Sequence, residues 1–191
     1  PLFTQTLAYE HWLGMQPTRL RSAFFRKLVL FADQSNNRNR HARYRTMGDK
    51  LLAHVPHTPH PGVFLLRGGD GERRMLRNEL EIAEHLRATR GFRIVNPLQC
   101  DVPGIVAACA GAQVVIGVEG SQLVHGVNVL QAGGCVLALQ PPNRFVSYYK
   151  YLTDRDHQYF SFVVGTPDGD GFTIDIDEVE RTLDLYQARR V

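Results

Sequence analysis

The stretch of residues 113–134 constrains the fold of this chain more than any other part. Its continuous apolar run, residues 114–116, predicts a strand covered on both faces, which is typical of a parallel sheet. Gly117 and Gly120 predict a tight turn, and Ser121 is a favourable N-cap for a following helix. Unpaired backbone N–H groups and the helix dipole converge at such a helix start, so the stretch indicates phosphate chemistry.

The chain after residue 60 alternates strands and helices with short connections. Helical crossovers join parallel strands, so we expect an α/β fold: a doubly wound, Rossmann-like parallel sheet with helices on both faces. Upstream we expect a strand at 28–32 and a basic helix at 39–53. The other expected strands are 63–67, 92–95, 113–118, 135–139 and 159–164, and the expected helices are 72–89, 101–110, 121–132, 144–152 and 176–189, with a turn at 167–171.

The proline-rich segment of residues 54–62 separates two parts of different charge, and we predict a domain boundary there. Residues 1–60 carry nine Lys and Arg against three acidic residues, whereas residues 151–191 carry four against nine. We therefore divide the chain into a basic N-terminal segment, 1–60, and a domain, 61–191. No recognition motif accompanies the basic residues, so nucleic-acid binding is not predicted. The three histidines of the segment lack Cys or carboxylate partners, which favours an exposed linker over a metal site.

Composition limits the class of protein. With 191 residues, 43% of them hydrophobic, the chain can bury one good core. It has no run of 18 apolar residues, so no membrane span is predicted. Its three cysteines lack metal-ligand spacing and indicate a reducing compartment, for which we predict the cytoplasm. The chain begins at Pro1 rather than Met, which is compatible with a fragment of a longer protein.

The first candidate site is the turn after the strand at 113–118. Glu119 places a carboxylate at the carboxyl edge of a central strand, where ligands bind in open α/β sheets. On the next helix Ser121, His125 and Asn128 share one face. His125 either contacts a ligand or is a solvated helix residue, and both alternatives stay open. No G-x-S-x-G motif is present, so a hydrolase triad is not predicted.

The second candidate site covers residues 67–79, where a strand ending in Arg67 is followed by a glycine-rich turn and a helix. Glu79 falls among the residues that we expect this helix to bury, together with Met75 and Leu80. A carboxylate there is costly unless it is paired, and Arg67 is the expected partner. The pair is either structural or serves to aim an arginine into a cleft, and we favour the second.

The third candidate site follows the strand at 135–139. We expect Gln140, Arg144 and Lys150 to reach a ligand over the same sheet edge. The tyrosines at 148, 149 and 151 are interpreted as helix-packing residues.

These three sites, in this order, resemble glycosyltransferase family 61, a GT-B-type group that includes capsular-polysaccharide enzymes. The resemblance covers roughly residues 62–165. It implies that this half is the C-terminal domain of a two-domain enzyme, which transfers sugar from a nucleotide-sugar donor to a glycan or another hydroxyl acceptor, with inversion and without a bound metal or other cofactor. The matching residues are 64–67 followed by Arg73, Arg74 and 77–79; 90–95; 110–123; and 136–142, which ends in Pro-Pro.

The resemblance also implies roles for individual residues. Arg67 and Arg73 would face the donor diphosphate. Arg77 would join them from a helix that Asn78 and Glu79 hold in place. The donor phosphate or sugar would be cradled by Gly120, Ser121 and Gln122, and Arg144 and Lys150 complete the expected donor site.

Two departures from the family pattern bear on activity. The family usually has His where Glu119 stands, and a carboxylate beside a diphosphate is repulsive unless it meets hydroxyls or Arg. The family's upstream His-Trp motif is echoed by His11 and Trp12, with too few residues in between for a complete acceptor-side domain. The acceptor hydroxyl needs a base, and its candidates are His11, Glu119 and His125. The alternative is a non-catalytic module that binds a nucleotide or other polysaccharide-assembly proteins.

Overall fold

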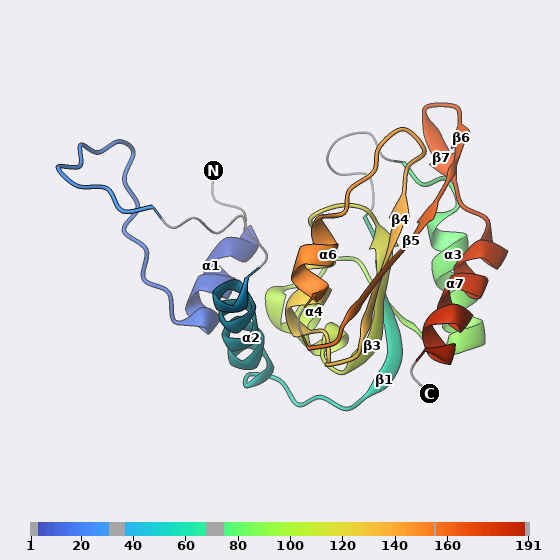
Figure 1. The fold of residues 1–191 in the computed structure, drawn as a ribbon, viewed down its shortest axis with the longest axis horizontal. Coiled ribbons are helices and arrows are strands. Elements are labelled where there is room, and N and C mark those ends of the chain that lie inside the picture. Colours follow the sequence, from blue (N-terminus) through green and yellow to red (C-terminus); the bar gives the residue numbers. More distant parts are fainter. Residues whose placement is uncertain (1–3, 31–36, 68–74, 155, 190–191) are drawn as a thin grey trace.

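The computed structural model of the chain describes residues 4–30, 37–67, 75–154 and 156–189. Its main body is a five-stranded parallel sheet with the strand order β2-β1-β3-β4-β5 (Figure 1). The predicted α/β fold with a parallel sheet is confirmed. The strands are β1 (His60–Leu65), β2 (Arg93–Val95), β3 (Ala112–Val118), β4 (Cys135–Gln140) and β5 (Tyr159–Val164).

Helices cover both faces of the sheet, as predicted (Figure 1). One face packs on α3 (Glu79–Arg90) and α7 (Ile176–Ala188), and the other on α4 (Val102–Cys109), α5 (Leu123–Val129) and α6 (Tyr148–Thr153). Successive strand residues point to opposite faces. In β1, Phe64 joins the α3 and α7 core, whereas Val63 and Leu65 join the other. Burial on both faces explains the continuous apolar runs of these strands.

The strand order reverses between β1 and β3. The chain runs from β1 through α3 to β2, and then returns through α4 to β3 on the other side of β1. Helices α3 and α5, which follow β1 and β3, pack on opposite faces of the sheet, so the chain leaves these two strands toward opposite faces. In open parallel sheets ligands bind in the crevice at such a switch point.

Two N-terminal helices, α1 (Thr4–Leu13) and α2 (Arg38–Leu52), form a further layer outside α4 and α5 (Figure 1). Leu51 of α2 is fully buried in the same core as Val63. At Gly48 the backbone of α2 comes so close to α5 that a Cβ would lie 2.6 Å from the carbonyl oxygen of Asn128. Helix α2 therefore packs tightly on the sheet domain, and the division at residue 60 stays a prediction.

The strand expected at 28–32 is wrong for residues 28–30, which have no regular structure, and residues 31–32 lie outside the described ranges. Leu28 and Leu30 are 61% and 80% exposed. Among the described residues, this β-prone sequence has no neighbouring strand to satisfy its backbone groups. The histidine segment also differs from expectation, because β1 begins at His60 and buries it, whereas His54 and His57 are exposed.

Helix α3 begins at Glu79 instead of residue 72. Leu76 forms a parallel bridge with Phe172, which holds the chain before the helix in an extended form. The expected burial of Met75 and Leu80 is therefore wrong, since they are 49% and 59% exposed. Phe172 belongs to a hairpin, β6 (Thr166–Asp168) and β7 (Gly171–Thr173), where the sequence predicts only a turn.

Two further helices begin later than expected, and side chains form hydrogen bonds with the backbone that precedes each of them. Helix α5 starts at Leu123, and Ser121 is not its N-cap; Gln122 takes that position and donates from Nε2 to the carbonyl oxygen of Val118 (2.5 Å). Helix α6 starts at Tyr148 after a loop held by Gln140. Helices α2, α4 and α7 begin and end within two residues of expectation. Helix α5 ends at Val129, three residues early, and α1 is not among the expected helices.

Candidate functional site

The loops that follow β1 and β3 meet at the switch point through Arg67. This residue stands two positions after β1, and its guanidinium Nη1 donates to the carbonyl oxygen of Glu119 at 3.0 Å. Glu119 is the first residue after β3. The contact therefore joins the two strand ends and holds a half-buried cation between them.

The backbone of Arg67 is fixed by Glu79, the first residue of α3. The N–H of Arg67 donates to Oε1 of Glu79 at 2.7 Å. A carboxylate in the first turn of a helix also interacts favourably with the helix dipole. The contact that the structure gives between Glu79 and Arg67 is with the main chain of Arg67, and pairing of the carboxylate with the guanidinium stays a prediction. The main-chain contact sets the direction in which the Arg67 side chain leaves the strand.

Gly120 allows the Arg67 side chain to lie against the turn. A Cβ at this position would collide with Nη1 of Arg67 and with Oε1 of Gln122. The backbone of Gly120 is bound by Tyr149, a residue of α6. Its N–H donates to the Tyr149 hydroxyl at 3.0 Å, and the hydroxyl donates to the Gly120 carbonyl oxygen at 2.5 Å. A phosphate could use this N–H only by displacing the phenol.

Sequence reasoning missed the role of Tyr149 and assigned it to helix packing. It is 3% exposed, and a buried tyrosine hydroxyl needs a hydrogen-bond partner. That requirement was the available signal, but the partner lies 29 positions away. In the same turn Gln122 is engaged with the carbonyl of Val118, whereas Ser121 is exposed at the sheet edge.

Glu119 itself is buried. Its side chain is 5% exposed, and Oε2 lies 3.7 Å from Nε of Arg144, whose side chain is 45% exposed. A buried carboxylate is costly without a compensating cation, which explains why the two side chains meet. The pair links the end of β3 to the loop after β4 and leaves part of the guanidinium in solvent.

Gln140 shapes the loop that carries Arg144. Its Nε2 donates to the carbonyl oxygen of Val146 at 2.8 Å, and its Oε1 accepts from the Val146 N–H at 3.2 Å. Gln140 is fully buried, so the expectation that it reaches a ligand is wrong. The two bonds hold the loop instead. Lys150, on α6, is exposed.

The structure places Arg77 and Asn78 against the hairpin. The guanidinium of Arg77 forms an ion pair with Asp170, in the turn between β6 and β7. The Asn78 amide binds both backbone groups of Ile174, with Nδ2 donating to the oxygen at 2.8 Å and Oδ1 accepting from the N–H at 3.2 Å. Both residues therefore attach the start of α3 to the chain before α7. Arg73 lies outside the described residues.

His125 links α5 to α1. Its Nδ1 lies 2.6 Å from the Tyr9 hydroxyl, and the two rings are stacked with centroids 5.6 Å apart. Burial lowers the pKa of His125 and raises the pKa of Tyr9, so both groups are neutral where they share this hydrogen bond. His11 is exposed in the last turn of α1. Among the described residues no hydrogen bond, ion pair or ring contact joins His11 to the strand ends.

The site is thus cationic, with one buried carboxylate. Arg67 and Arg144 come from different strand ends, and both converge on Glu119. Within the described ranges no group of three or more His, Cys, Asp or Glu is placed to hold a metal ion. Burial raises the pKa of the Cys109 and Cys135 thiols to about 12, so they are poor nucleophiles. The arrangement suits an anionic ligand that also carries hydroxyl groups.

Fold and site together define an α/β protein with an arginine-bearing candidate site at the carboxyl edge of a parallel sheet. The model of the family Glycosyltransferase 61 matches residues 6–137. The chain belongs to glycosyltransferase family 61, as the sequence motifs predict. Membership implies glycosyltransferase activity in general, with a sugar donor and an acceptor. A search of the curated proteins finds no match to the chain.

The matched range has a clear relation to the site. It contains both N-terminal helices and the strand ends that carry Arg67 and Glu119, and it ends within β4. Arg144 and Tyr149 lie beyond it. The part of the site between β1 and β3 is therefore covered by the family pattern, and the loop after β4 and α6 lie outside the matched range.

Proposed function

We propose that the chain binds a nucleotide-sugar donor at the carboxyl edge between β1 and β3 and transfers its sugar to a hydroxyl of a glycan or another acceptor. The observation that carries this proposal is the Arg67 guanidinium bound between the two strand ends at the switch point. A fixed cation at that place suits a diphosphate, because guanidinium groups bind phosphate oxygens through paired donors.

The donor diphosphate would be held by Arg67 and Arg144, with Arg73 and Lys150 as further candidates from the sequence. Negative charge develops on the diphosphate as it leaves, and preorganised cations lower the barrier by stabilising that charge. With arginines in this role, transfer proceeds without a bound metal. Family resemblance supports inversion by direct displacement, and it supports reading 61–191 as the donor side of a GT-B enzyme, with 1–60 as a reduced acceptor side.

Glu119 is our first choice for the base among the three candidates. It alone lies on the turn that carries the Arg67 contact, whereas His125 is bound to Tyr9 and His11 is exposed on α1. The ion pair with Arg144 offsets the repulsion between its carboxylate and the diphosphate. Direct displacement needs a group that accepts the acceptor's proton, and a carboxylate at the sheet edge meets that need.

A second candidate function is a non-catalytic module that binds a nucleotide or another polysaccharide-assembly protein. Two contacts favour it. Glu119, which stands where the family usually has His, forms an ion pair with Arg144. His125 forms a hydrogen bond with Tyr9. Such a module would bind a nucleotide or a partner without turning over a donor.

Thermal unfolding with UDP, GDP, CDP and ADP tests the binding step. A ligand at about one hundred times its Kd stabilises the folded state by about 2.7 kcal/mol. We expect a rise in Tm with one of them, which Arg67→Ala abolishes and the exposed-site control Arg87→Ala keeps. The absence of a rise with all four would contradict the proposal for this chain.

A turnover assay separates the two candidate functions. Release of nucleoside diphosphate from a nucleotide sugar, in the presence of a metal chelator, supports the metal-free transferase. Binding without release supports the module. Activity that disappears with chelator and returns with a divalent cation would contradict the metal-free part alone.

We also propose a cytoplasmic location. The free thiols of the two buried cysteines support it, since they suit a reducing compartment. In the part of the chain that the structure describes, every helix is too short or too polar to cross a membrane.

A further inference from the structure

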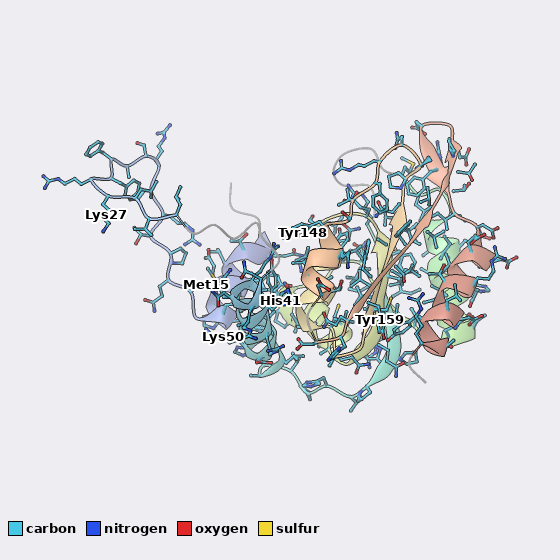
Figure 2. The ribbon with its side chains drawn as sticks, viewed as in Figure 1. Met15, Lys27, His41, Lys50, Tyr148 and Tyr159 are labelled. Carbon is cyan, nitrogen blue, oxygen red and sulfur yellow. The ribbon has the colours of Figure 1, made fainter. Side chains whose placement is uncertain are left out.

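Residues 14–30, which follow α1 and are here called the arm, project from the molecule. They form neither helix nor strand, and every one of them is exposed. Figure 1 shows the arm extending away from the sheet domain, on the side of α1 and α2. Figure 2 places Lys27 at its far end and Met15 near its base.

The base of the arm is attached to the helices. The backbone N–H of Met15 donates to the carbonyl oxygen of Glu10 at 2.8 Å, and the Glu10 carboxylate forms an ion pair with Arg19. Lys50 of α2 donates from Nζ to the carbonyl oxygen of Leu13 at 2.8 Å. The folded domain therefore fixes where the arm leaves it, while the outer part of the arm is presented to the surroundings.

The arm combines bulky apolar side chains with positive charge and has no acidic residue. Phe24 is 92% exposed and Leu30 80% exposed. Contiguous exposed apolar groups of this size mark an interaction surface. The other exposed apolar residues are Met15, Leu20, Phe25, Leu28 and Val29, and the cations are Arg19, Arg21, Arg26 and Lys27.

We propose that the arm binds the surface of an anionic lipid membrane. Both phenylalanines lie within two residues of Arg26, so apolar and cationic groups are interleaved along the arm. A lipid surface accepts this mixture, because phenylalanine and leucine enter the acyl boundary while Arg and Lys reach the headgroup phosphates. Arg19 is paired with Glu10, and the other three cations, Arg21, Arg26 and Lys27, select an anionic surface.

Other occupants fit the arm less well. The buried centre of a protein interface is depleted in charged residues, and lysine is depleted in interfaces as a whole, whereas Arg26 and Lys27 stand in the middle of the apolar run. Nucleic acid would use the arginines and stack on the phenylalanines. Nucleic acid offers no apolar surface for the aliphatic residues 28–30, whereas the acyl region of a membrane would bury them.

Vesicle co-sedimentation of the whole chain tests the proposal. We expect sedimentation with vesicles that contain about one third phosphatidylglycerol in phosphatidylcholine, weak sedimentation with phosphatidylcholine alone, and release as salt is raised. The double variants Phe24→Ser/Phe25→Ser and Arg26→Gln/Lys27→Gln should each weaken binding about tenfold or more.

Matched controls lie on the opposite side of the molecule. Leu185→Ser changes a 65% exposed leucine on α7, and Arg87→Gln/Arg189→Gln removes two exposed cations. Both should bind vesicles like the unchanged chain. Because the arm is exposed, its variants should keep the Tm and any nucleotide-induced rise in Tm, so this test and that of the proposed function fail separately.

Three results would overturn the proposal: no sedimentation with anionic vesicles at low salt, equal binding to uncharged vesicles, or arm variants that bind as well as the controls. Concentration-dependent dimers that the arm variants abolish, or binding of a single-stranded oligonucleotide without binding of vesicles, would assign the arm to a second copy of the chain or to nucleic acid.

Discussion

The Arg67 guanidinium lies against Gly120 at the carboxyl edge of the sheet, in the space that a side chain at residue 120 would fill. The guanidinium lies where a Cβ of residue 120 would stand, while its Nη1 donates to the carbonyl oxygen of the preceding residue, Glu119. The two positions are 53 residues apart, yet each depends on the other. A cation at the switch point requires that residue 120 have no side chain.

Gly120→Ala should therefore displace the Arg67 side chain. The colliding atoms are the ends of flexible side chains, so the fold should survive the change. Loss of one charge-assisted hydrogen bond, worth about 1.5–3 kcal/mol, predicts roughly tenfold to hundredfold weaker nucleotide binding. Titration calorimetry measures it, with the exposed Arg87→Ala, on α3, as the control. Unchanged affinity in Gly120→Ala would contradict the role of Arg67.

Tyr149→Phe should destabilise the protein through Gly120. The change removes a hydroxyl that binds both backbone groups of the glycine, and it leaves a buried N–H and a buried carbonyl oxygen without this partner. We expect a loss of about 1–3 kcal/mol in the free energy of unfolding. Urea denaturation measures it. In the control Tyr159→Phe the lost hydroxyl makes no hydrogen bond with the described residues, and a loss of equal size there would refute the argument.

Glu119→Gln and Arg144→Gln together separate two roles of the buried carboxylate. If Glu119 accepts the proton, its variant should keep nucleotide binding and lose about 10²–10⁴-fold in kcat, while Arg144→Gln mainly raises KM. If Glu119 only positions Arg144, both variants should weaken nucleotide binding to a similar extent. Steady-state kinetics with a calorimetric Kd distinguish the two patterns.

Glu180 should make stability depend on pH. It is partly buried on α7, which opposes its ionisation, but hydrogen bonds from Arg90, His85 and Thr89 prevail and hold its pKa below the usual value. A lowered pKa in the folded state stabilises the protein above the unfolded-state pKa, near 4.3. This stability is lost as the pH falls through the folded-state pKa.

Urea denaturation from pH 6 down to about pH 3 measures this contribution. Glu180→Gln should lower the free energy of unfolding at pH 6 and flatten its fall in acid. The control is Glu178→Gln, since Glu178 is exposed on the same helix and pairs only with Arg181 in the described residues. Equal curves for the two variants would show that the contacts of Glu180 do not stabilise the fold.

The order of strands and helices could be predicted where the spacing of apolar residues along the sequence matches the spacing of the buried residues in the structure. Val114–Ile116 and the apolar run of β4 are covered on both faces, and their continuous apolar sequence reflects this directly. Prediction failed where a distant residue decides local structure. Leu76 pairs with Phe172, and α3 begins only after it. Gln140 forms hydrogen bonds with Val146, and α6 begins only after that residue. The apolar run at residues 28–30 has strand character, but it pairs with no strand in the part of the chain that the structure describes.

The sequence by itself determined the alternating α/β fold, the glycine turn after β3 and the family. The fold and the turn follow from periodicity and from the backbone requirements of glycine, whereas the contact of Glu79 with the Arg67 N–H depends on α3 starting at Glu79. Only the tertiary structure decided that β3 lies beside β1, so that Arg67 meets Glu119 and Gly120, and that Tyr149 closes the turn. Those contacts depend on which elements pack together, and packing between distant segments leaves no periodic trace in either segment.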